Sequence, residues 1–423
     1  MRQTMTVATL ALCVSLACHA TDVPSIPTAA DVQQASADTL SPRILVHPMT
    51  TVDPSTGVGY FQDPYPIHTS APDAKPGLPV FSGTTQQLLS CPGVMRPDCF
   101  SATRVTLDPG PFAAQAAAQG ATINNFEGLN IFQDDAGTWQ MAVTAHLKKG
   151  TGDGWNVVMH AHARGQAMGV PTAWVADTLL VGDLGRPAPD NYNGKYFADN
   201  GTLYLIYNKK VGEGQDAVVA QVMLSPTQKG DHAPVPLLGP ETANGGYNSE
   251  LADGLNQPNA VKLVETGNVT KIDGKYVMTY SVGTFNRRDY KSGIAWSDTF
   301  LPPSGTYYRR VEQPDTAGVW GQANHSEVRY LLQSQIPAWP NYVGGQVLAP
   351  GVPSIVRGPK GAYFLAFAGY DPSDAPTNDK GLYKGPHRRP YYVRLDVHVP
   401  GGKTVVGASM RELAGWVEPA RVP

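Results

Sequence analysis

The segment DGKYVMTY at residues 273–280 begins with a turn and continues as alternating apolar and polar side chains. Three other segments repeat this pattern: AGTWQMAVT at 136–144, NGTLYLIY at 200–207 and KGAYFLAF at 360–367. A turn glycine followed by aromatic and β-branched residues is typical of a hairpin that leads into a strand. The segments at 129–133, 268–272 and 353–357 supply a preceding strand, and a less regular fifth unit lies at 60–67.

Successive turn glycines are 64, 73 and 87 residues apart, which is enough for a four-stranded sheet with its loops. Radial repetition of such sheets predicts an all-β fold, a five-bladed β-propeller over residues 41–423. A strand at 43–46 is expected to close the ring against 391–397. A two-sheet sandwich is the alternative, but it does not account for the repeat.

Composition agrees with many short strands joined by turns. The chain has 423 residues, with 44 glycines, 37 prolines and only 16% charged residues. The net charge is −3, and no basic stripe with interleaved aromatic residues is found, so nucleic acid is not an expected partner. The sequence does not predict an oligomeric state.

Residues 1–20 are typical of a signal peptide, since Arg2 precedes an apolar run too short to span a bilayer. Cleavage after Ala20 and acylation at Cys18 as a lipid anchor are both open. A flexible tether is expected at 21–40. We therefore expect a periplasmic or secreted protein, or an outer-membrane lipoprotein, with no transmembrane segment.

Two cysteines, Cys91 and Cys99, lie outside the predicted signal. In an oxidising compartment they are expected to form a disulfide, on a loop leading from blade one to blade two. A metal site is the alternative. It is disfavoured because no further thiol or histidine lies close by in the sequence.

Acidic residues recur nine or ten residues before the turn glycines, where the innermost strand of each blade should start at the central pore. Glu127 and Glu265 occupy this position in blades two and four. Asp63 directly precedes the apolar strand of blade one, and Asp190 directly precedes the corresponding position of blade three. Clustered carboxylates suit glycoside hydrolysis, which needs a general acid and a general base or nucleophile. Taken singly, each acid is better explained as a turn or strand-start residue, but their repeated placement in register favours the functional interpretation.

Residues 265–281 resemble the fourth-blade motif of the family-43 glycoside hydrolases, which are arabinanases, arabinofuranosidases and β-xylosidases. Residues 293–298, Asp63-Pro64, 348–356 and Arg389 resemble further parts of the same five-bladed family. The resemblance implies that Glu265 is the general acid, that Asp63 is the general base and that hydrolysis inverts the anomeric carbon. Asp190 or Glu127 would supply the charge that keeps Glu265 protonated, because the family's third-blade Asp falls near Asn191–Asn193.

Val352 stands where the family often has a histidine near a central ion, so no cofactor or metal is expected, and a central calcium is the disfavoured alternative. His160 and His162 alternate on one strand face and are expected to belong to an outer blade strand, with metal binding as the alternative. The partner is expected to be a carbohydrate. The residues predicted to bind it are Asn193, Tyr280, Arg288, His325 and Arg389. A non-catalytic glycan-binding propeller is the alternative function.

Overall fold

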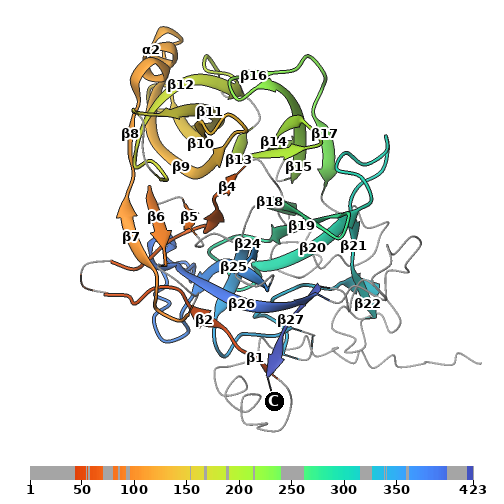
Figure 1. The fold of residues 1–423 in the computed structure, drawn as a ribbon. Coiled ribbons are helices and arrows are strands. Elements are labelled where there is room, and N and C mark those ends of the chain that lie inside the picture. Colours follow the sequence, from red (N-terminus) through yellow and green to blue (C-terminus); the bar gives the residue numbers. More distant parts are fainter. Residues whose placement is uncertain are drawn as a thin grey trace, which may run out of the picture.

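The computed structural model describes residues 43–422 with gaps at 54, 56–57, 70–79, 84–85, 92–95, 153, 166–168, 187–189, 213–214, 240–261, 315–325, 338, 340, 359–361 and 398–416. The predicted signal peptide, the tether and Cys18 therefore lie outside the described residues. Consecutive sheets follow one another around a ring, from β5–β7 through β9–β12, β13–β17 and β18–β21 to β24–β26 (Figure 1). The chain is an all-β, five-bladed β-propeller.

Each blade is a set of four antiparallel strands, with the strand nearest the centre first. Blade one contains β3 (Tyr65–Pro66), β5 (Val80–Ser82), β6 (Gln87–Ser90) and β7 (Ser101–Arg104). Blade two contains β9 (Thr122–Gln133), β10 (Trp139–Lys148), β11 (Trp155–Ala163) and β12 (Ala173–Val181). Blade three contains β13 (Asn191–Asp199), β14 (Thr202–Gly212), β15 (Gln215–Ser225) and β17 (Val235–Leu238). Blade four contains β18 (Lys262–Ile272), β19 (Lys275–Val282), β20 (Lys291–Ser297) and β21 (Arg309–Arg310). Blade five contains β24 (Leu348–Arg357), β25 (Tyr363–Tyr370), β26 (Arg389–Val397) and β2 (His47–Pro48).

Short strands extend or connect these blades. In blade two, β4 (His68–Thr69) pairs with β9 and β8 (Thr106–Asp108) pairs with β12. β16 (Gln228–Lys229) pairs with β15, and β27 (Val417–Pro419) pairs with β26. β22 (Glu312–Pro314) and β23 (Ser326–Val328) form a separate pair. Blades three and four are joined by a parallel pairing between the starts of β15 and β18.

The four repeated segments form the hairpins that the sequence predicted. In blades three and four the two turn residues both have positive φ, with 48° and 77° at Asn200 and Gly201, and 46° and 76° at Asp273 and Gly274. This geometry requires residues that tolerate the left-handed region, which Asn, Asp and Gly do best. The turn chemistry thus sets the register of each hairpin locally.

The ring closes between the two ends of the described chain, but not with the predicted strand. His47 pairs with Tyr392 and Pro48 with Tyr391, so β2 completes blade five. The preceding strand β1 (Arg43–Ile44) pairs instead with β28 (Arg421–Val422). The strand that closes the ring therefore lies at residues 47–48, just after the predicted segment 43–46.

A helix that the sequence analysis did not expect packs on blade two. Helix α2 (Gly110–Ala118) is rich in alanine, the strongest helix former, and its Phe112 and Ala116 are buried on one face. Gly120, with a φ of 73°, follows its end. Because only two of its residues are buried, the helical periodicity of apolar residues was too weak to predict this helix from the sequence. A short 3₁₀ helix, η2 (Gly385–His387), precedes β26. No helix in the described ranges is long and apolar enough to cross a membrane.

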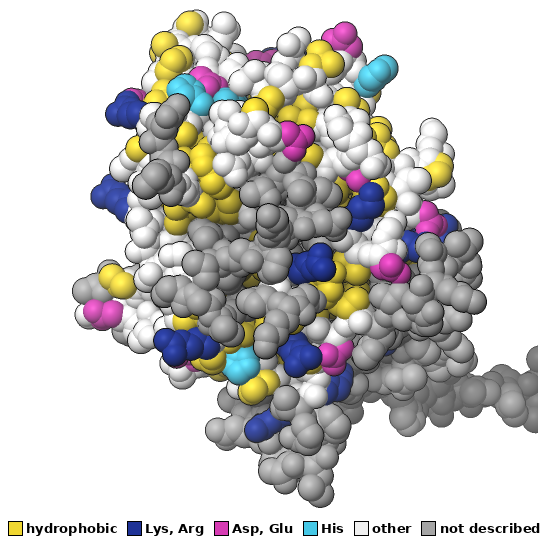
Figure 2. Space-filling view, in the orientation of Figure 1, with side chains coloured by type: hydrophobic (Ala, Val, Ile, Leu, Met, Phe, Trp, Pro, Cys, Tyr) yellow, Lys and Arg dark blue, Asp and Glu magenta, His cyan; other side chains and the backbone are white. Residues whose placement is uncertain are grey.

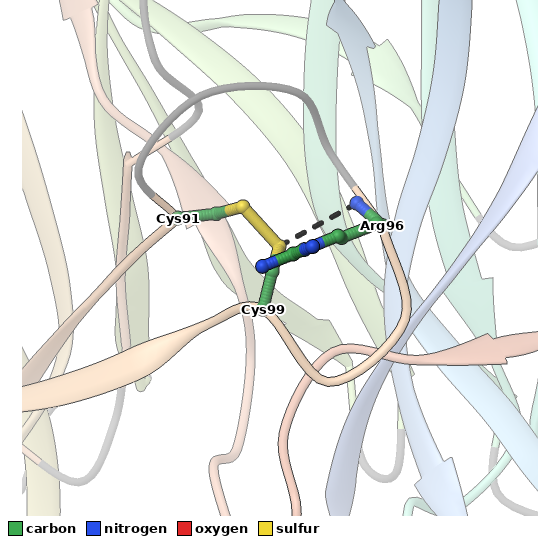
Figure 3. The surroundings of a disulfide bond; sticks show 3 residues. All are labelled: Cys91, Arg96 and Cys99. Atoms are coloured by element: carbon green, nitrogen blue, oxygen red, sulfur yellow. Dashed lines mark hydrogen bonds between the residues drawn. A yellow bond between two sulfur atoms is a disulfide. The ribbon is translucent and has the colours of Figure 1, made fainter.

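Cys91 and Cys99 form the predicted disulfide, with their Cα atoms 5.3 Å apart. The backbone N–H of Arg96 donates a hydrogen bond to Cys99 Sγ (Figure 3). The predicted position was wrong, because the bond links the segment between β6 and β7, two strands of the same blade. It fastens a hairpin within blade one.

Apolar cores fill the spaces between neighbouring sheets. One such core joins Val218 of β15 to Val264 and Met278 of blade four, all of them fully buried. Such packing leaves polar groups at the strand ends and on the surface. On the face drawn in Figure 2, the described Lys and Arg side chains lie scattered among acidic and apolar ones.

Candidate active site

The central end of every blade contains a residue in the left-handed region. These residues have φ between 54° and 61°: Asp63, Gly128, Asn193, Thr266 and Val352. In blades two to five they coincide with a register shift between the innermost strand and its neighbour. A bulge of this kind redirects the adjacent side chains. Because it recurs in each blade, it turns one set of side chains toward the centre of the ring.

Hydrogen bonds between blades show that these ends converge. The Tyr65 hydroxyl of blade one donates to Asn193 Oδ1 of blade three at 3.3 Å. The Asn193 backbone N–H donates to Thr144 Oγ1 of blade two at 2.8 Å. The Val352 N–H of blade five donates to Ser281 Oγ of blade four at 2.7 Å. These bonds link blades one to three and blades four and five, and Asn208 of blade three joins the two sets by donating to the Val264 carbonyl of blade four.

Glu265 lies at this centre, on β18, and is partly exposed. Tyr290 Oη lies 2.6 Å from its Oε1, and Tyr192 Oη lies 3.2 Å from its Oε2. Burial raises the pKa of Glu265 to about 7; the hydrogen bond from Tyr290 opposes this rise, and the charges of Asp216 and Asp63 add to it. Glu265 is therefore a carboxylic acid that stays protonated close to neutral pH.

Two features of neighbouring blades hold Glu265 and Tyr290 in place. The buried Asn208 donates to the Val264 carbonyl and accepts from the Thr266 N–H, both at 2.9 Å, and so fixes the backbone on either side of Glu265. A Cβ at Gly351 would lie 1.9 Å from Cε1 of Tyr290. Gly351 is thus required for Tyr290 to reach Glu265.

Asp63 precedes β3, and its side chain is 15% exposed. The buried Arg388 donates from Nη1 to Asp63 Oδ1 at 2.8 Å, and its guanidinium carbon lies 5.4 Å from the centre of the Tyr290 ring. Because Tyr290 contacts Glu265, an unbroken chain of contacts connects the two predicted catalytic carboxyl groups. Asp63 and Glu265 belong to one site.

Lys195 is a buried cation in the same site. Its Nζ lies 4.5 Å from the centre of the Tyr65 ring and 3.3 Å from the Asn193 carbonyl oxygen. Burial lowers its pKa to about 7, although Asp63 and Glu265 pull it upward. Lys195 is therefore a second group in this cluster that titrates near neutral pH.

Glu127 and Asp190 lie at the same end of the ring, and both are partly exposed. Burial raises the pKa of Glu127, and the charges of Asp63 and Asp190 raise it further. Asp190 accepts a hydrogen bond from the Asn156 backbone N–H at 2.8 Å. The carboxylate joined to Glu265 through a hydrogen-bonded side chain is instead Asp216, through Tyr192.

The residues predicted to bind substrate are spread over different environments. Asn193 is at the centre, and Arg288 lies in the loop after β19, where it donates to the Tyr383 side chain. Arg389 Nη1 contacts Asp371, so it is the neighbouring Arg388 that reaches Asp63. Tyr280 is fully buried in an apolar core, and the structure therefore corrects the prediction that it contacts substrate. His325 lies outside the described residues.

Val352, the position compared with a family histidine near an ion, is buried in an apolar cluster with Tyr65, Tyr290 and Tyr370. An alkyl side chain supplies no ligand atom, so these surroundings do not fit a calcium ion. Among the residues that the structure describes, no group of three or more His, Cys, Asp or Glu side chains is placed to hold a metal ion.

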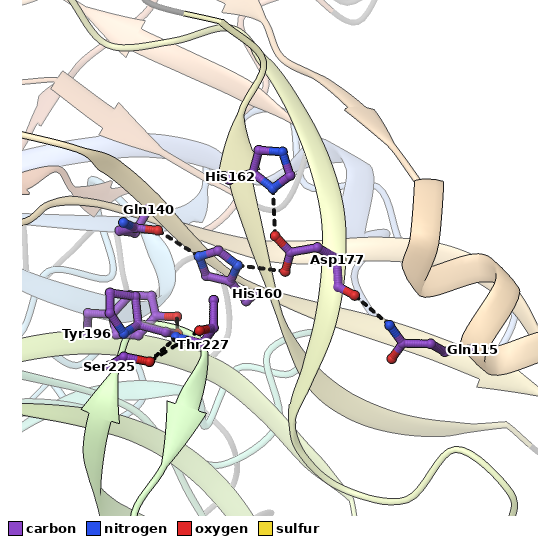
Figure 4. Close-up of polar contacts among 9 residues, drawn as sticks. Gln115, Gln140, His160, His162, Asp177, Tyr196, Ser225 and Thr227 are labelled. Carbon is purple, nitrogen blue, oxygen red and sulfur yellow. Dashed lines mark hydrogen bonds and ion pairs between the residues drawn. The ribbon is translucent and has the colours of Figure 1, made fainter.

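His160 and His162 lie on β11, the third strand of blade two, as the sequence predicted. Asp177 of β12 accepts from both, at 2.7 Å from His160 Nδ1 and 2.6 Å from His162 Nδ1 (Figure 4). His160 Nε2 lies 2.8 Å from Gln140 Oε1. The cluster ties strands of one blade together.

Four site residues were not predicted in the roles they occupy: Tyr192, Asp216, Tyr290 and Arg388. Tyr192 lies within the segment Asn191–Asn193, and Arg388 directly precedes the predicted Arg389. Tyr290 lies two residues after Arg288, and no sequence pattern marks it. Asp216 opens a strand of ordinary hairpin pattern, and no sequence signal distinguishes it.

Neither protein-family models nor curated proteins give a match to this sequence. Solved structures do resemble it. A thermostable family-43 glycoside hydrolase has a TM-score of 0.53 and 17% identity, over 88% of this chain and 98% of that one. An α-L-arabinofuranosidase from Lactobacillus brevis has a TM-score of 0.55 and 15% identity, over 82% of this chain and 93% of that one. An exo-1,5-α-L-arabinanase from a bovine ruminal metagenomic library has a TM-score of 0.50 and 12% identity, over 80% and 94%. The resemblance predicted from the sequence is thus confirmed at the level of the fold, which is that of distant family-43 glycoside hydrolases.

Proposed function

We propose that this protein is a glycoside hydrolase in which Glu265 is the general acid and Asp63 the general base. The observation that carries the proposal is the environment of Glu265: a partly exposed carboxyl group at the centre of the ring, with a pKa raised to about 7. A general acid must hold its proton at the working pH until the leaving group takes it. The fold shared with family-43 glycoside hydrolases supports the same role.

The two carboxyl groups have contrasting partners. Burial and the charges of Asp216 and Asp63 favour the neutral form of Glu265, and they outweigh the opposing hydrogen bond from Tyr290. Asp63 accepts a hydrogen bond from the guanidinium of Arg388. Glycoside hydrolysis needs a general acid and a base that activates water, and we assign these roles to Glu265 and Asp63.

In the proposed reaction Glu265 gives its proton to the glycosidic oxygen as the bond to the anomeric carbon breaks. Asp63 takes a proton from a water molecule, whose oxygen attacks the opposite face of that carbon. The product therefore has the inverted anomeric configuration, as the family resemblance implies. We propose a sugar of a plant or microbial polysaccharide as the substrate class, because two structural neighbours are an arabinofuranosidase and an arabinanase.

The proposal is tested by incubating the protein with arabinan, xylan and their oligosaccharides, and measuring released reducing sugar at pH 5 to 8. Proton NMR of the first product, recorded before mutarotation, reports the anomer. Hydrolysis that is lost in both Glu265→Gln and Asp63→Asn supports the assignment. Hydrolysis by the native protein that survives both substitutions would contradict it.

One observation favours a second candidate, a glycan-binding propeller without catalysis. Asn193 occupies in blade three the left-handed position that Asp63 occupies in blade one, and it brings an amide where an acid could stand. Amides hydrogen bond to sugar hydroxyls without exchanging protons. Binding of an oligosaccharide by calorimetry, with no turnover across the panel, would support this candidate over the enzyme.

A further inference from the structure

The hydroxyl of Tyr192 lies between two carboxyl groups. Its Oη is 2.6 Å from Asp216 Oδ2 and 3.2 Å from Glu265 Oε2. A phenol has one hydrogen and can donate it to only one of the two. Both carboxyl groups are within donating distance, and because the shorter contact is the stronger one, we infer that the hydrogen points to Asp216. The oxygen of Tyr192 then presents a lone pair to Glu265, and the 3.2 Å contact is favourable only if Glu265 Oε2 carries a proton.

The position of Asp216 follows from the parallel pairing between blades three and four. Asp216 pairs with Leu263, two residues before Glu265, at the start of β15 and β18. This pairing brings a strand of one blade to the central strand of the next, and Asp216 is 8% exposed there. The strand pairing therefore fixes the backbone of Asp216 beside the central strand.

We propose that Asp216 is a positioning residue that orients the Tyr192 hydroxyl and thereby keeps a proton on Oε2 of Glu265. The inference rests on the proposed function, in which Glu265 donates this proton as the general acid. Tyr290 donates to the other oxygen, Oε1, at 2.6 Å. One phenol thus accepts from the neutral acid while the other donates to it, and together they fix the orientation of its carboxyl group.

Other ionisable groups also face this cluster, and a test must separate them from the Tyr192 path. The charge of Asp63 favours the neutral form of Glu265. The cations of Lys195 and Arg388 interact with Glu265 and favour its carboxylate. Tyr65 lies in the same electrostatic neighbourhood. Asp190 and Lys210 act on Asp216 itself, with opposite signs. If Asp216 acts on Glu265 through its charge, its effect on the Glu265 titration persists when the Tyr192 hydroxyl is removed. If it acts by orienting that hydroxyl, the effect is lost.

The test is a double-mutant cycle read by titration of Glu265. Protein labelled with ¹³C at the side-chain carboxyl of glutamate is titrated by NMR, and the Glu265 signal is assigned by its absence in Glu265→Gln. Asp216→Asn is measured in the native background and in Tyr192→Phe. Asp135→Asn, which removes one exposed charge in the turn before β10, is the matched control. Asp216→Ala, which also removes the acceptor, serves if the Asn variant does not fold.

We expect Asp216→Asn to lower the titration midpoint of Glu265 by about one pH unit, since the freed phenol hydrogen turns to Glu265 and stabilises its carboxylate. In Tyr192→Phe the same substitution should shift the midpoint by less than about half as much, and Asp135→Asn should not shift it. Equal shifts in both backgrounds, or no shift in either, would overturn the proposal.

Activity gives an independent reading. A general acid works only while protonated, so the alkaline limb of the pH–rate profile should move to lower pH by the same amount in Asp216→Asn. If the midpoint shifts as expected but no substrate is turned over by any form, the proposed function fails and the role of Asp216 stands. If turnover is normal and the midpoint does not move, the role of Asp216 fails and the proposed function stands.

Discussion

Two clusters of polar side chains, one around Glu265 at the centre of the ring and one around Asp177 on the outer strands of blade two, shift a carboxyl group in opposite directions. Burial raises the pKa of Glu265 to about 7. Burial would also raise the pKa of Asp177, but the hydrogen bonds from His160 and His162 outweigh it and lower that pKa. The difference lies in the partners, since imidazoles stabilise a carboxylate while other acids destabilise it.

The two clusters also differ in what they connect. Asp177 links strands β11 and β12 of one blade, and Gln115 of helix α2 donates a hydrogen bond to the backbone carbonyl of Asp177 at 2.6 Å. Glu265 is contacted by side chains from blades three and four and is partly exposed. Under the proposed function, the Asp177 cluster serves folding and the Glu265 cluster serves catalysis. The predictions that follow separate these roles.

The largest expected effect is that of Asp63→Asn. If Asp63 activates water, the substitution should lower kcat by about a thousandfold on every substrate, whatever its leaving group. The measurement compares a natural oligosaccharide with an aryl glycoside, after circular dichroism has shown that the variant is folded. A variant that keeps full activity on either substrate would remove Asp63 from the mechanism.

Glu265→Gln should cost about a hundredfold or more on an oligosaccharide, because a sugar leaving group needs the proton. An aryl glycoside with an acidic phenol leaves without protonation and should be much less affected. Rates for the two substrates, measured with the same preparation, give the ratio directly. An equal loss on both substrates would mean that Glu265 is not the general acid.

Asp177→Asn tests the other cluster and should act on stability alone. It removes a charged acceptor from two imidazoles, which we expect to lower the free energy of unfolding by about 2 kcal/mol. Urea unfolding followed by fluorescence measures this change. Asp135→Asn on the surface should stay within about 0.5 kcal/mol. A loss of turnover in folded Asp177→Asn would contradict the separation of roles.

The pH dependence of stability should show the smallest but most discriminating difference. The lowered pKa of Asp177 means that its contribution is present above its ordinary value of 3.8 and is lost as the pH falls below it. Glu265 acts the other way, since its pKa is raised from 4.5 to about 7, and stability falls as the pH rises through that range. Glu265→Gln should therefore gain stability relative to the native protein between pH 4.5 and 7. Parallel stability profiles for the two proteins would contradict this sign.

The hairpins and the blade order could be predicted from the sequence because both depend on local patterns. Turn pairs such as Asn200-Gly201 and alternating apolar residues encode the register of neighbouring strands. The position of Glu265 at the start of an innermost strand followed from the same repeat. The disulfide was predictable because Cys91 and Cys99 are the two cysteines outside the predicted signal peptide.

The partners of the site residues could not be predicted, because each comes from a distant part of the chain. Arg388 and Asp63 are separated by 325 residues, and Tyr192 and Glu265 by 73. The pairing of β15 with β18, which brings Asp216 to Glu265, depends on how two blades pack and leaves no local pattern. Arg389 was predicted from the family resemblance, whereas its neighbour Arg388 contacts Asp63, and the sequence alone does not say which of two adjacent side chains points to the centre.

One NMR titration of both carboxyl groups tests the central claim most directly. Protein labelled with ¹³C at the side-chain carboxyl groups of aspartate and glutamate is titrated from pH 2 to 9, with Glu265→Gln and Asp177→Asn assigning the two signals. The account predicts that Glu265 titrates at about 7, above its ordinary 4.5, and that Asp177 titrates below its ordinary 3.8. A Glu265 midpoint at or below 4.5 would contradict it, because the proposed general acid would then be ionised at neutral pH.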